Sequence, residues 1–227
     1  MATIKINNVT ALTESGGTVV LDSAVTGIPA AGVTGVLPVG VTGGSGLNAV
    51  NTGLVHIITA SVGTGANTGS TFTNFWSSSY KTYWIILRDI GHGHSGTAEL
   101  RIQYHTSGGA EAGAAYEAVI AGWGSNSVVY SVAQEGSTSL KICPNLGEET
   151  GRQYNAQFTM NGMSGVDTYT TICGSCAWYH GSNYIVSGAL AGHYSGNYAT
   201  DFVGFQLLLN NGVFNSGSVS IFGIKES

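Results

Sequence analysis

The chain has 227 residues, a formal net charge of −5 and only 8% charged residues. Globular domains carry about 25% charged residues, so neutral groups supply the polar surface here. Gly, Ser, Thr and Asn together account for 97 of the 227 residues. The 7 Lys and Arg residues are scattered and cannot neutralise a run of phosphates or anionic lipid head groups. The composition therefore excludes nucleic-acid binding and electrostatic membrane binding.

A hydrophobic content of 43% and an aromatic content of 10% are too high for a disordered chain. The longest apolar stretches, such as residues 203–209, are far shorter than a membrane span, so we expect no membrane insertion. The N-terminus lacks a hydrophobic signal core, which predicts no secretory export. Three cysteines, an odd number, argue against a disulfide framework, and we expect reduced thiols at synthesis.

The first 50 residues differ in character from the rest. Residues 3–6 and 18–21 predict two short strands separated by polar, Gly-containing turns. Residues 28–50 are rich in Gly, and Gly or Pro interrupts each short apolar pair, which predicts an extended linker. Because this region cannot bury its Val, Ile and Leu side chains alone, we expect it to associate with copies of itself.

Residues 51–227 show the pattern of an antiparallel β domain. Residues 100–105 alternate apolar and polar side chains, the period of two that marks a half-exposed strand. No helical spacing persists for three turns, so we expect very little helix. The sequence predicts an all-β sandwich or barrel. Further candidate strands, separated by Gly- and Ser-rich turns, occupy residues 54–62, 83–90, 116–120, 128–132, 140–142, 157–160, 168–172, 202–209 and 218–224.

Several segments resemble bacteriophage tail-fibre proteins. Residues 35–46, Gly-Val-Leu-Pro-Val-Gly-Val-Thr-Gly-Gly-Ser-Gly, resemble the Gly-x-Leu-Pro…Gly-Gly-Thr-Gly unit of fibre shafts, with Ser45 in place of Thr. Residues 80–90 and 100–109 resemble the Tyr-x-x-Tyr-x-Ile/Leu…Gly-Gly pattern of jelly-roll fibre tips. Residues 215–225 are similar to the closing strand of those tips, with Phe222 where Tyr is common.

The resemblance implies a virion fibre protein, made in the host cytoplasm and displayed on the virion. Residues 1–27 would attach to a virion protein and form a homotrimer, and residues 28–50 would be a fibre-like linker. Residues 51–227 would form a jelly-roll-like β-sandwich tip that binds a host surface glycan or another receptor. Two alternatives stay open: a capsid-decorating or head-fibre protein, and a polysaccharide depolymerase.

The sequence favours adhesion over catalysis. Residues 91–96 match Gly-x-Gly-x-x-Gly, but a strand follows where a dinucleotide site needs a helix. The sequence has no Gly-x-Ser-x-Gly elbow for a hydrolase nucleophile. A glycosidase needs two carboxylates that face each other across a sugar, whereas the adjacent pair Glu148 and Glu149 point to opposite faces of an extended chain. We therefore expect no enzymatic activity and no cofactor.

Two groups of residues are candidate metal ligands. His92 and His94 point the same way on an extended backbone, and three copies around a threefold axis would offer six imidazoles. The alternative is an exposed hairpin turn. Cys173 and Cys176 have metal-knuckle spacing, which Cys143 and His180 could complete as a Cys₃His zinc set. A disulfide formed after release from the cell, or free thiols, are the other interpretations.

The segment from Trp178 to Tyr198 is the predicted receptor-binding region. It holds five of the 15 Trp and Tyr residues, mixed with Asn and His and interrupted by Gly. Aromatic faces pack against the C–H face of a sugar, and functional side chains often lie on loops. The alternative is that these aromatics line the core or a trimer interface. The predicted contact residues are Trp178, Tyr179, Tyr184, His193, Tyr194 and Tyr198.

Overall fold

The computed structural model describes residues 53–65, 68–77, 79–147, 153–162, 169–196 and 202–225, and the backbone of three short strands between residues 3 and 21. The chain divides into two compact units, Met1–Asn51 and Thr52–Ser227. The predicted linker at residues 28–50 lies outside the described residues.

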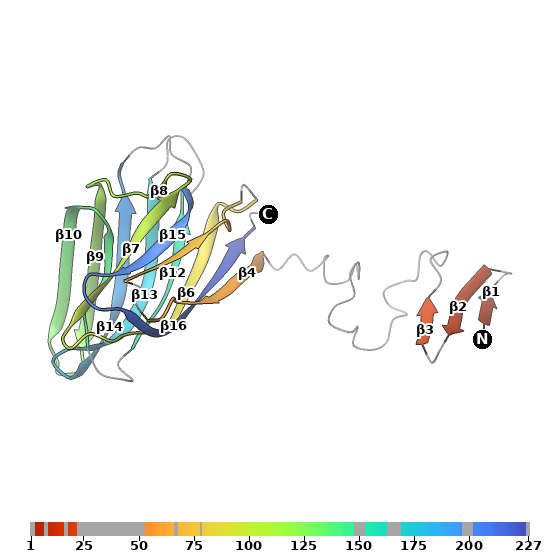
Figure 1. The fold of residues 1–227 in the computed structure, drawn as a ribbon, viewed down its shortest axis with the longest axis horizontal. Helices are drawn as coiled ribbons and strands as arrows, with labels where there is room; N and C mark the ends of the chain where they lie inside the picture. Colours follow the sequence, from red (N-terminus) through yellow and green to blue (C-terminus); the bar gives the residue numbers. More distant parts are fainter. Residues whose placement is uncertain are drawn as a thin grey trace. The chain divides into compact units, whose positions relative to one another are not determined.

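The N-terminal unit contains a three-stranded antiparallel sheet in the order β1-β2-β3 (Figure 1). Its strands are β1 (Thr3–Ile6), β2 (Val9–Ser15) and β3 (Thr18–Leu21). The first and third coincide with the two strands expected from sequence. The interval between them was expected to be a turn and instead forms a strand that pairs with both neighbours.

The described residues of the C-terminal unit form 13 strands, and the pairings among them are antiparallel. Eight strands follow one another in the order β4-β16-β6-β12-β13-β14-β9-β10, and we call them the large layer. The small layer has the order β11-β7-β15-β5, with the short β8 beside β7. The bounds of these strands are β4 Leu54–Ser61, β5 Gly69–Thr73, β6 Thr82–His92, β7 Ala98–Thr106, β8 Gly109–Ala110, β9 Tyr116–Gly124, β10 Val129–Ser137, β11 Leu140–Leu146, β12 Tyr154–Asn161, β13 Thr170–His180, β14 Tyr184–Tyr194, β15 Phe202–Leu209 and β16 Phe214–Ile224.

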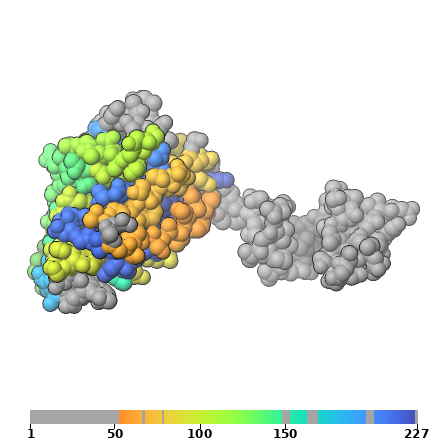
Figure 2. All heavy atoms as spheres, in the orientation of Figure 1, coloured from red at the N-terminus to blue at the C-terminus, as the bar shows by residue number. Residues whose placement is uncertain are grey.

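The two layers belong to one curled sheet. A single bridge between Leu146 and His180 joins β11 to β13, and β11 then packs against β9, β10 and β14. Strands distant in sequence lie side by side: β4 pairs with β16, and β5 pairs with β15, as the neighbouring orange and blue atoms of Figure 2 show. The predicted all-β, sandwich-like fold is confirmed, and the described residues contain no helix that could cross a membrane.

The core lies between the two layers and is made by side chains at alternate positions of each strand. On β9, Tyr116 and Ile120 are buried, whereas Val119 is 45% exposed. Tyr104 of the small layer packs on Tyr116 of the large layer with ring centroids 5.7 Å apart. Such aromatic pairs contribute about 0.5–1.5 kcal/mol each beyond the area that they bury. Alternation also gives the large layer an outer face, directed away from the core, and this face carries the candidate site.

The segment from Trp178 to Tyr198 is not a loop in its described part. It forms the end of β13, a turn at residues 181–183 and the whole of β14, which pair in register over their full length. Gly188 lies inside β14 because β9 approaches closely: a Cβ there would stand 2.2 Å from the carbonyl oxygen of Ala121. Gly188 and Gly192, two of the glycines that suggested a loop, therefore accommodate the neighbouring strand β9.

Candidate functional site

The six predicted receptor residues do not form one surface, because alternation along β13 and β14 separates them. Trp178 is 1% exposed and Tyr194 is 5% exposed, so both belong to the core. Trp178 contacts the ring of Tyr130 at 5.4 Å, and Tyr194 contacts Tyr116 at 4.7 Å and Phe202 at 5.6 Å. The prediction that Trp178 and Tyr194 contact a receptor is wrong, because both side chains are buried in the core of the sandwich and cannot reach a ligand.

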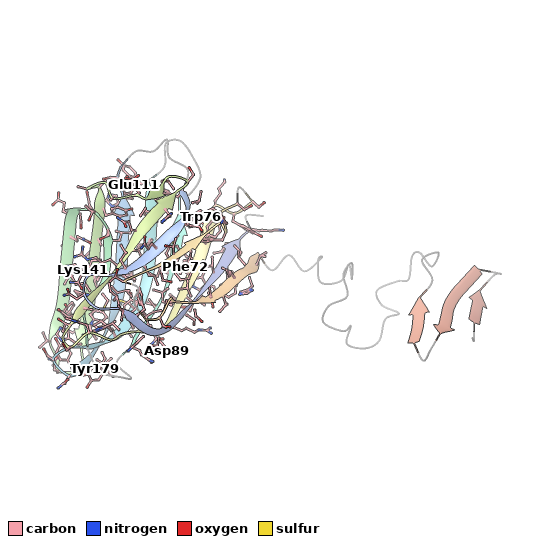
Figure 3. The ribbon with its side chains drawn as sticks, viewed as in Figure 1. Phe72, Trp76, Asp89, Glu111, Lys141 and Tyr179 are labelled. Carbon is pink, nitrogen blue, oxygen red and sulfur yellow. The ribbon has the colours of Figure 1, made fainter. Side chains whose placement is uncertain are left out.

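The remaining predicted residues lie in different places. Tyr184 is half-buried and stacks on the His180 ring at 4.4 Å, beside the β13–β14 turn. Tyr179 points to the outer face at the end of the unit that also carries Asp89 (Figure 3). His193 points to the outer face near the opposite end of the hairpin, because it pairs with Thr171 at the start of β13. Tyr198 lies outside the described residues.

His92 and His94 do not form a metal site within this chain. His92, at the end of β6, is 1% exposed. Its Nε2–H donates to the carbonyl oxygen of Leu146 at 3.1 Å, and its Nδ1 accepts the backbone N–H of His94 at 3.2 Å. Since hydrogen bonds occupy both ring nitrogens, His92 offers no lone pair to a cation. The ring is a structural element that ties β6 to β11, and the expectation of an exposed turn also fails at His92.

The cysteines do not converge on a common ion. Cys173 and Cys176 are three residues apart on β13, about 10 Å along the strand, and point to opposite faces. Cys173 is exposed, whereas Cys143 and Cys176 are buried thiols. This geometry rules out both the predicted zinc set and a Cys173–Cys176 disulfide. Among the residues that the structure describes, no group of three or more His, Cys, Asp or Glu side chains could hold a metal.

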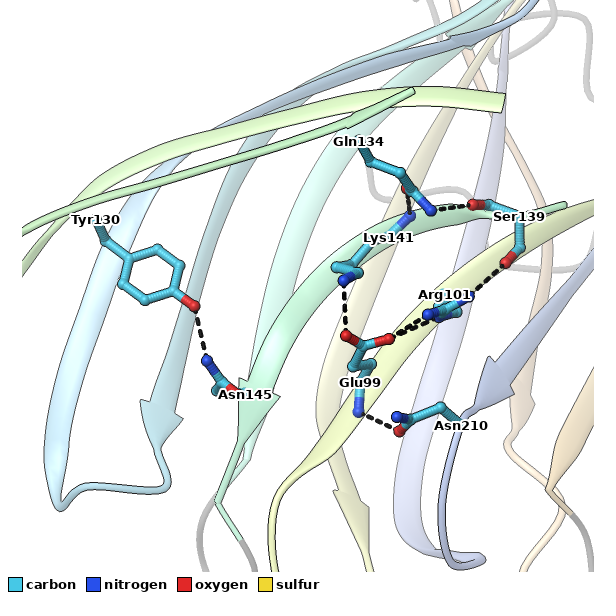
Figure 4. Close-up of polar contacts among 8 residues, drawn as sticks. All are labelled: Glu99, Arg101, Tyr130, Gln134, Ser139, Lys141, Asn145 and Asn210. Atoms are coloured by element: carbon cyan, nitrogen blue, oxygen red, sulfur yellow. Dashed lines mark hydrogen bonds and ion pairs between the residues drawn. The ribbon is translucent and has the colours of Figure 1, made fainter. Parts of the chain in front are cut away.

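A charged cluster occupies the small layer, where Glu99 of β7 contacts Arg101 and Lys141 (Figure 4). The Lys141 Nζ lies 2.6 Å from Glu99 Oε1, and the Arg101 Nε–H donates to Glu99 Oε2 at 2.9 Å. Burial raises the pKa of Glu99, but hydrogen bonds from Lys141 and Arg101 outweigh it, so the pKa lies below its ordinary value. With both cations engaged by one carboxylate, the cluster serves to link β7 to β11.

The strongest candidate site is a shallow depression of about 640 Å³ on the outer face of the large layer. We call it the outer-face depression. Its floor is made of small and apolar groups from β9, β13 and β14, and polar side chains stand around it. The residues that define it here are Glu117, Val119, Tyr169, Thr171, Ala191 and His193.

Strand register brings these side chains together. His193 of β14 pairs with Glu117 of β9 on one side and with Thr171 of β13 on the other. Tyr169 precedes β13, is 53% exposed, and its ring meets the His193 ring edge to face at 5.7 Å. The site is therefore held by three paired strands, which restrict the positions of its side chains more than a loop would.

The polar groups of the depression suit a ligand rich in hydroxyls. The His193 Nε2 and the nearer Glu117 carboxylate oxygen are 3.6 Å apart, longer than a hydrogen bond. The carboxylate can accept a hydrogen bond from a ligand hydroxyl, and the imidazole can donate or accept one. The exposed Tyr169 ring offers a flat apolar face with a polar tip. Together these groups match the mixed C–H and O–H surface of a sugar.

Sequence reasoning found one member of this site and missed the others. His193 was among the predicted receptor residues, whereas Glu117 and Thr171 were seen only as positions in strands. Tyr169 is an aromatic residue of the kind that was sought, but it lies outside residues 178–198, the segment chosen for its many Trp and Tyr residues. The missing information was that β9 pairs with β14, a contact between strands more than 60 residues apart in sequence.

Comparison with known proteins adds no assignment: no protein-family model, curated protein or solved structure matches the chain.

Proposed function

We propose that the chain is a virion-fibre adhesin whose C-terminal unit binds a host surface glycan at the outer-face depression. The observation that carries this proposal is the combination of Tyr169, His193 and Glu117 around an open depression of about 640 Å³. An aromatic face can pack against the C–H face of a sugar, while neighbouring polar side chains form hydrogen bonds with the sugar hydroxyls. The low charge of the chain supports the same ligand class, because hydroxyl-based contacts are insensitive to salt.

We propose binding without hydrolysis. Most glycoside hydrolases place two carboxylates on either side of the scissile bond. Glu117 is the only carboxylate among the described residues that line the depression. A single carboxylate can orient a sugar hydroxyl but cannot supply both the acid and the base or nucleophile of the reaction.

The binding proposal is tested with a panel of immobilised bacterial surface polysaccharides. Wild-type protein is expected to retain at least one polysaccharide, and Tyr169→Ala is expected to weaken that binding about tenfold or more. Ile58→Ala is the control, because Ile58 is 40% exposed on the edge strand β4, which β16, β6 and β12 separate from β13. Equal loss in both variants, or no retention by the wild type, contradicts the proposal. Release of new reducing ends from a retained polysaccharide would show a depolymerase instead.

A further inference from the structure

A second depression, of about 310 Å³, lies on the same outer face of the large layer. Its lining comes from β6, β12, β13 and β14, and we call it the amide depression after its two exposed amides. Asn155 and Gln157 of β12 contribute these amides, and Ser175 and Ser187 contribute hydroxyls. Amide and hydroxyl groups both donate and accept hydrogen bonds, so this lining also suits a sugar.

Strand β13 connects the two depressions. Thr171 lines the outer-face depression and Ser175 lines the amide depression. The two residues are four positions apart on one strand, so their side chains share a face and stand about 13 Å apart. Cys173 lies between them on that face and is exposed. The path from one depression to the other therefore runs over a small side chain.

An aromatic row borders this path on its β6 side. Trp84 pairs with Thr159 of β12, which in turn pairs with Cys173 of β13. Trp84 is half-buried and its ring centroid lies 5.5 Å from that of Phe222 on β16. Thr159 lies between Trp84 and Cys173, so one hydroxyl group separates the aromatic pair from the path over Cys173.

We infer that the two depressions are subsites for one extended oligosaccharide chain, which crosses the outer face over Cys173. This inference rests on the proposed glycan-binding function and adds that the ligand is polymeric. One sugar unit occupies the outer-face depression beside Tyr169 and His193, and a later unit of the same chain contacts Gln157 and Ser175. Because the second contact is intramolecular once the first is made, affinity rises steeply with chain length.

The natural thiol of Cys173 reports occupancy of the path. Oligosaccharides of increasing length, prepared from the retained polysaccharide, are added at saturation, and maleimide labelling of Cys173 is followed by peptide mass spectrometry. Long chains are expected to slow labelling at least about tenfold, and the monosaccharide is expected to leave the rate unchanged. Labelling of a Cys173→Ala variant gives the background from other sites.

Affinity measurements on a surface variant give an independent readout. Gln157 is exposed, so Gln157→Ala preserves the fold and is expected to weaken binding of the long chain about three- to tenfold. The same variant is expected to bind the monosaccharide as the wild type does. Long-chain binding that leaves Cys173 labelling unchanged, or affinity that does not depend on length, overturns the two-subsite inference while the glycan-binding function stands. Failure of every glycan to bind overturns both.

Discussion

Glu99 is a carboxylate whose surroundings fix its charge. Its backbone N–H donates to Asn210 Oδ1 at 2.6 Å, and its side chain, 20% exposed, contacts Arg101 and Lys141. Since contacts with the two cations lower its pKa in the folded protein, folding favours the ionised form. The stability that Glu99 contributes is therefore present above its unfolded pKa and is lost as the pH falls through its folded pKa.

Glu99→Gln should lower the free energy of unfolding at neutral pH by about 1–2 kcal/mol, because it leaves two half-buried cations without their anion. The difference between variant and wild type should shrink as the pH falls through the lowered pKa of the folded Glu99 carboxyl, because the wild-type side chain is then protonated as well. Urea unfolding at several pH values measures both effects. Glu135→Gln, at an exposed position of β10, is the control and should change little. A pH-independent difference at position 99 would show that charge is not the cause.

The three thiols should react at different rates. Burial raises the pKa of Cys143, and raises the pKa of Cys176 to about 11, so both remain protonated at neutral pH and are covered by the core. Cys173 is exposed on β13. Iodoacetamide should modify Cys173 in the folded protein and the other two only after unfolding, because the thiolate is the nucleophile. Rapid modification of Cys176 in the native protein, detected by peptide mass spectrometry, would place it on the surface instead.

At the scale of elements, the β13–β14 hairpin determines both the core and the outer face. Its two strands pair over eleven register positions, from Thr170 with Tyr194 to His180 with Tyr184. Large buried side chains such as Trp178 alternate with small outward ones such as Ala189. Glycine at the inward position 188 allows β9 to approach β14 closely, and these paired strands contribute the floor of the outer-face depression.

Gly188→Val tests this close approach. Any Cβ at this position would stand 2.2 Å from the Ala121 carbonyl oxygen and 2.5 Å from the Gly122 Cα, both backbone atoms of β9. The strands must separate to admit the side chain, so we expect a loss of about 3 kcal/mol or more of stability. Ala189→Val, one residue along the same strand but facing solvent, should cost less than about 0.5 kcal/mol. Equal denaturation midpoints for the two variants would contradict the packing of β9 on β14.

Sequence patterns predicted the strands that alternate large apolar and polar residues. Residues 100–105 and 116–120 are examples, and both lie inside observed strands. The pattern failed for β14, because glycines at the inward positions 188 and 192 and small Ser and Ala residues at outward positions resemble a loop. It also failed to separate Trp178 from Tyr179, because which face of a strand is buried depends on its neighbours in the sheet. The site could not be predicted as a unit because its residues converge only through the pairing of β9, β13 and β14.

At the scale of the whole molecule, we propose that the N-terminal unit gathers three chains and presents three C-terminal units to the host. Light scattering of the full chain should give about three times the mass of one chain, since a segment of about 50 residues is too short to bury its Val, Ile and Leu side chains alone. A chain that begins at residue 52 keeps the whole core of the C-terminal unit and should be monomeric. A full chain that stays monomeric at micromolar concentration would contradict the trimer.

We propose that the outer face of the large layer binds a host glycan. An NMR titration of backbone amides with an oligosaccharide from a retained polysaccharide tests it most directly, because each residue reports separately. We expect concentration-dependent shifts at Glu117, Thr171 and His193, and little change at Glu99 and Lys141 on the small layer. Saturable shifts confined to the small layer, with the amides of β9, β13 and β14 unchanged, would contradict it.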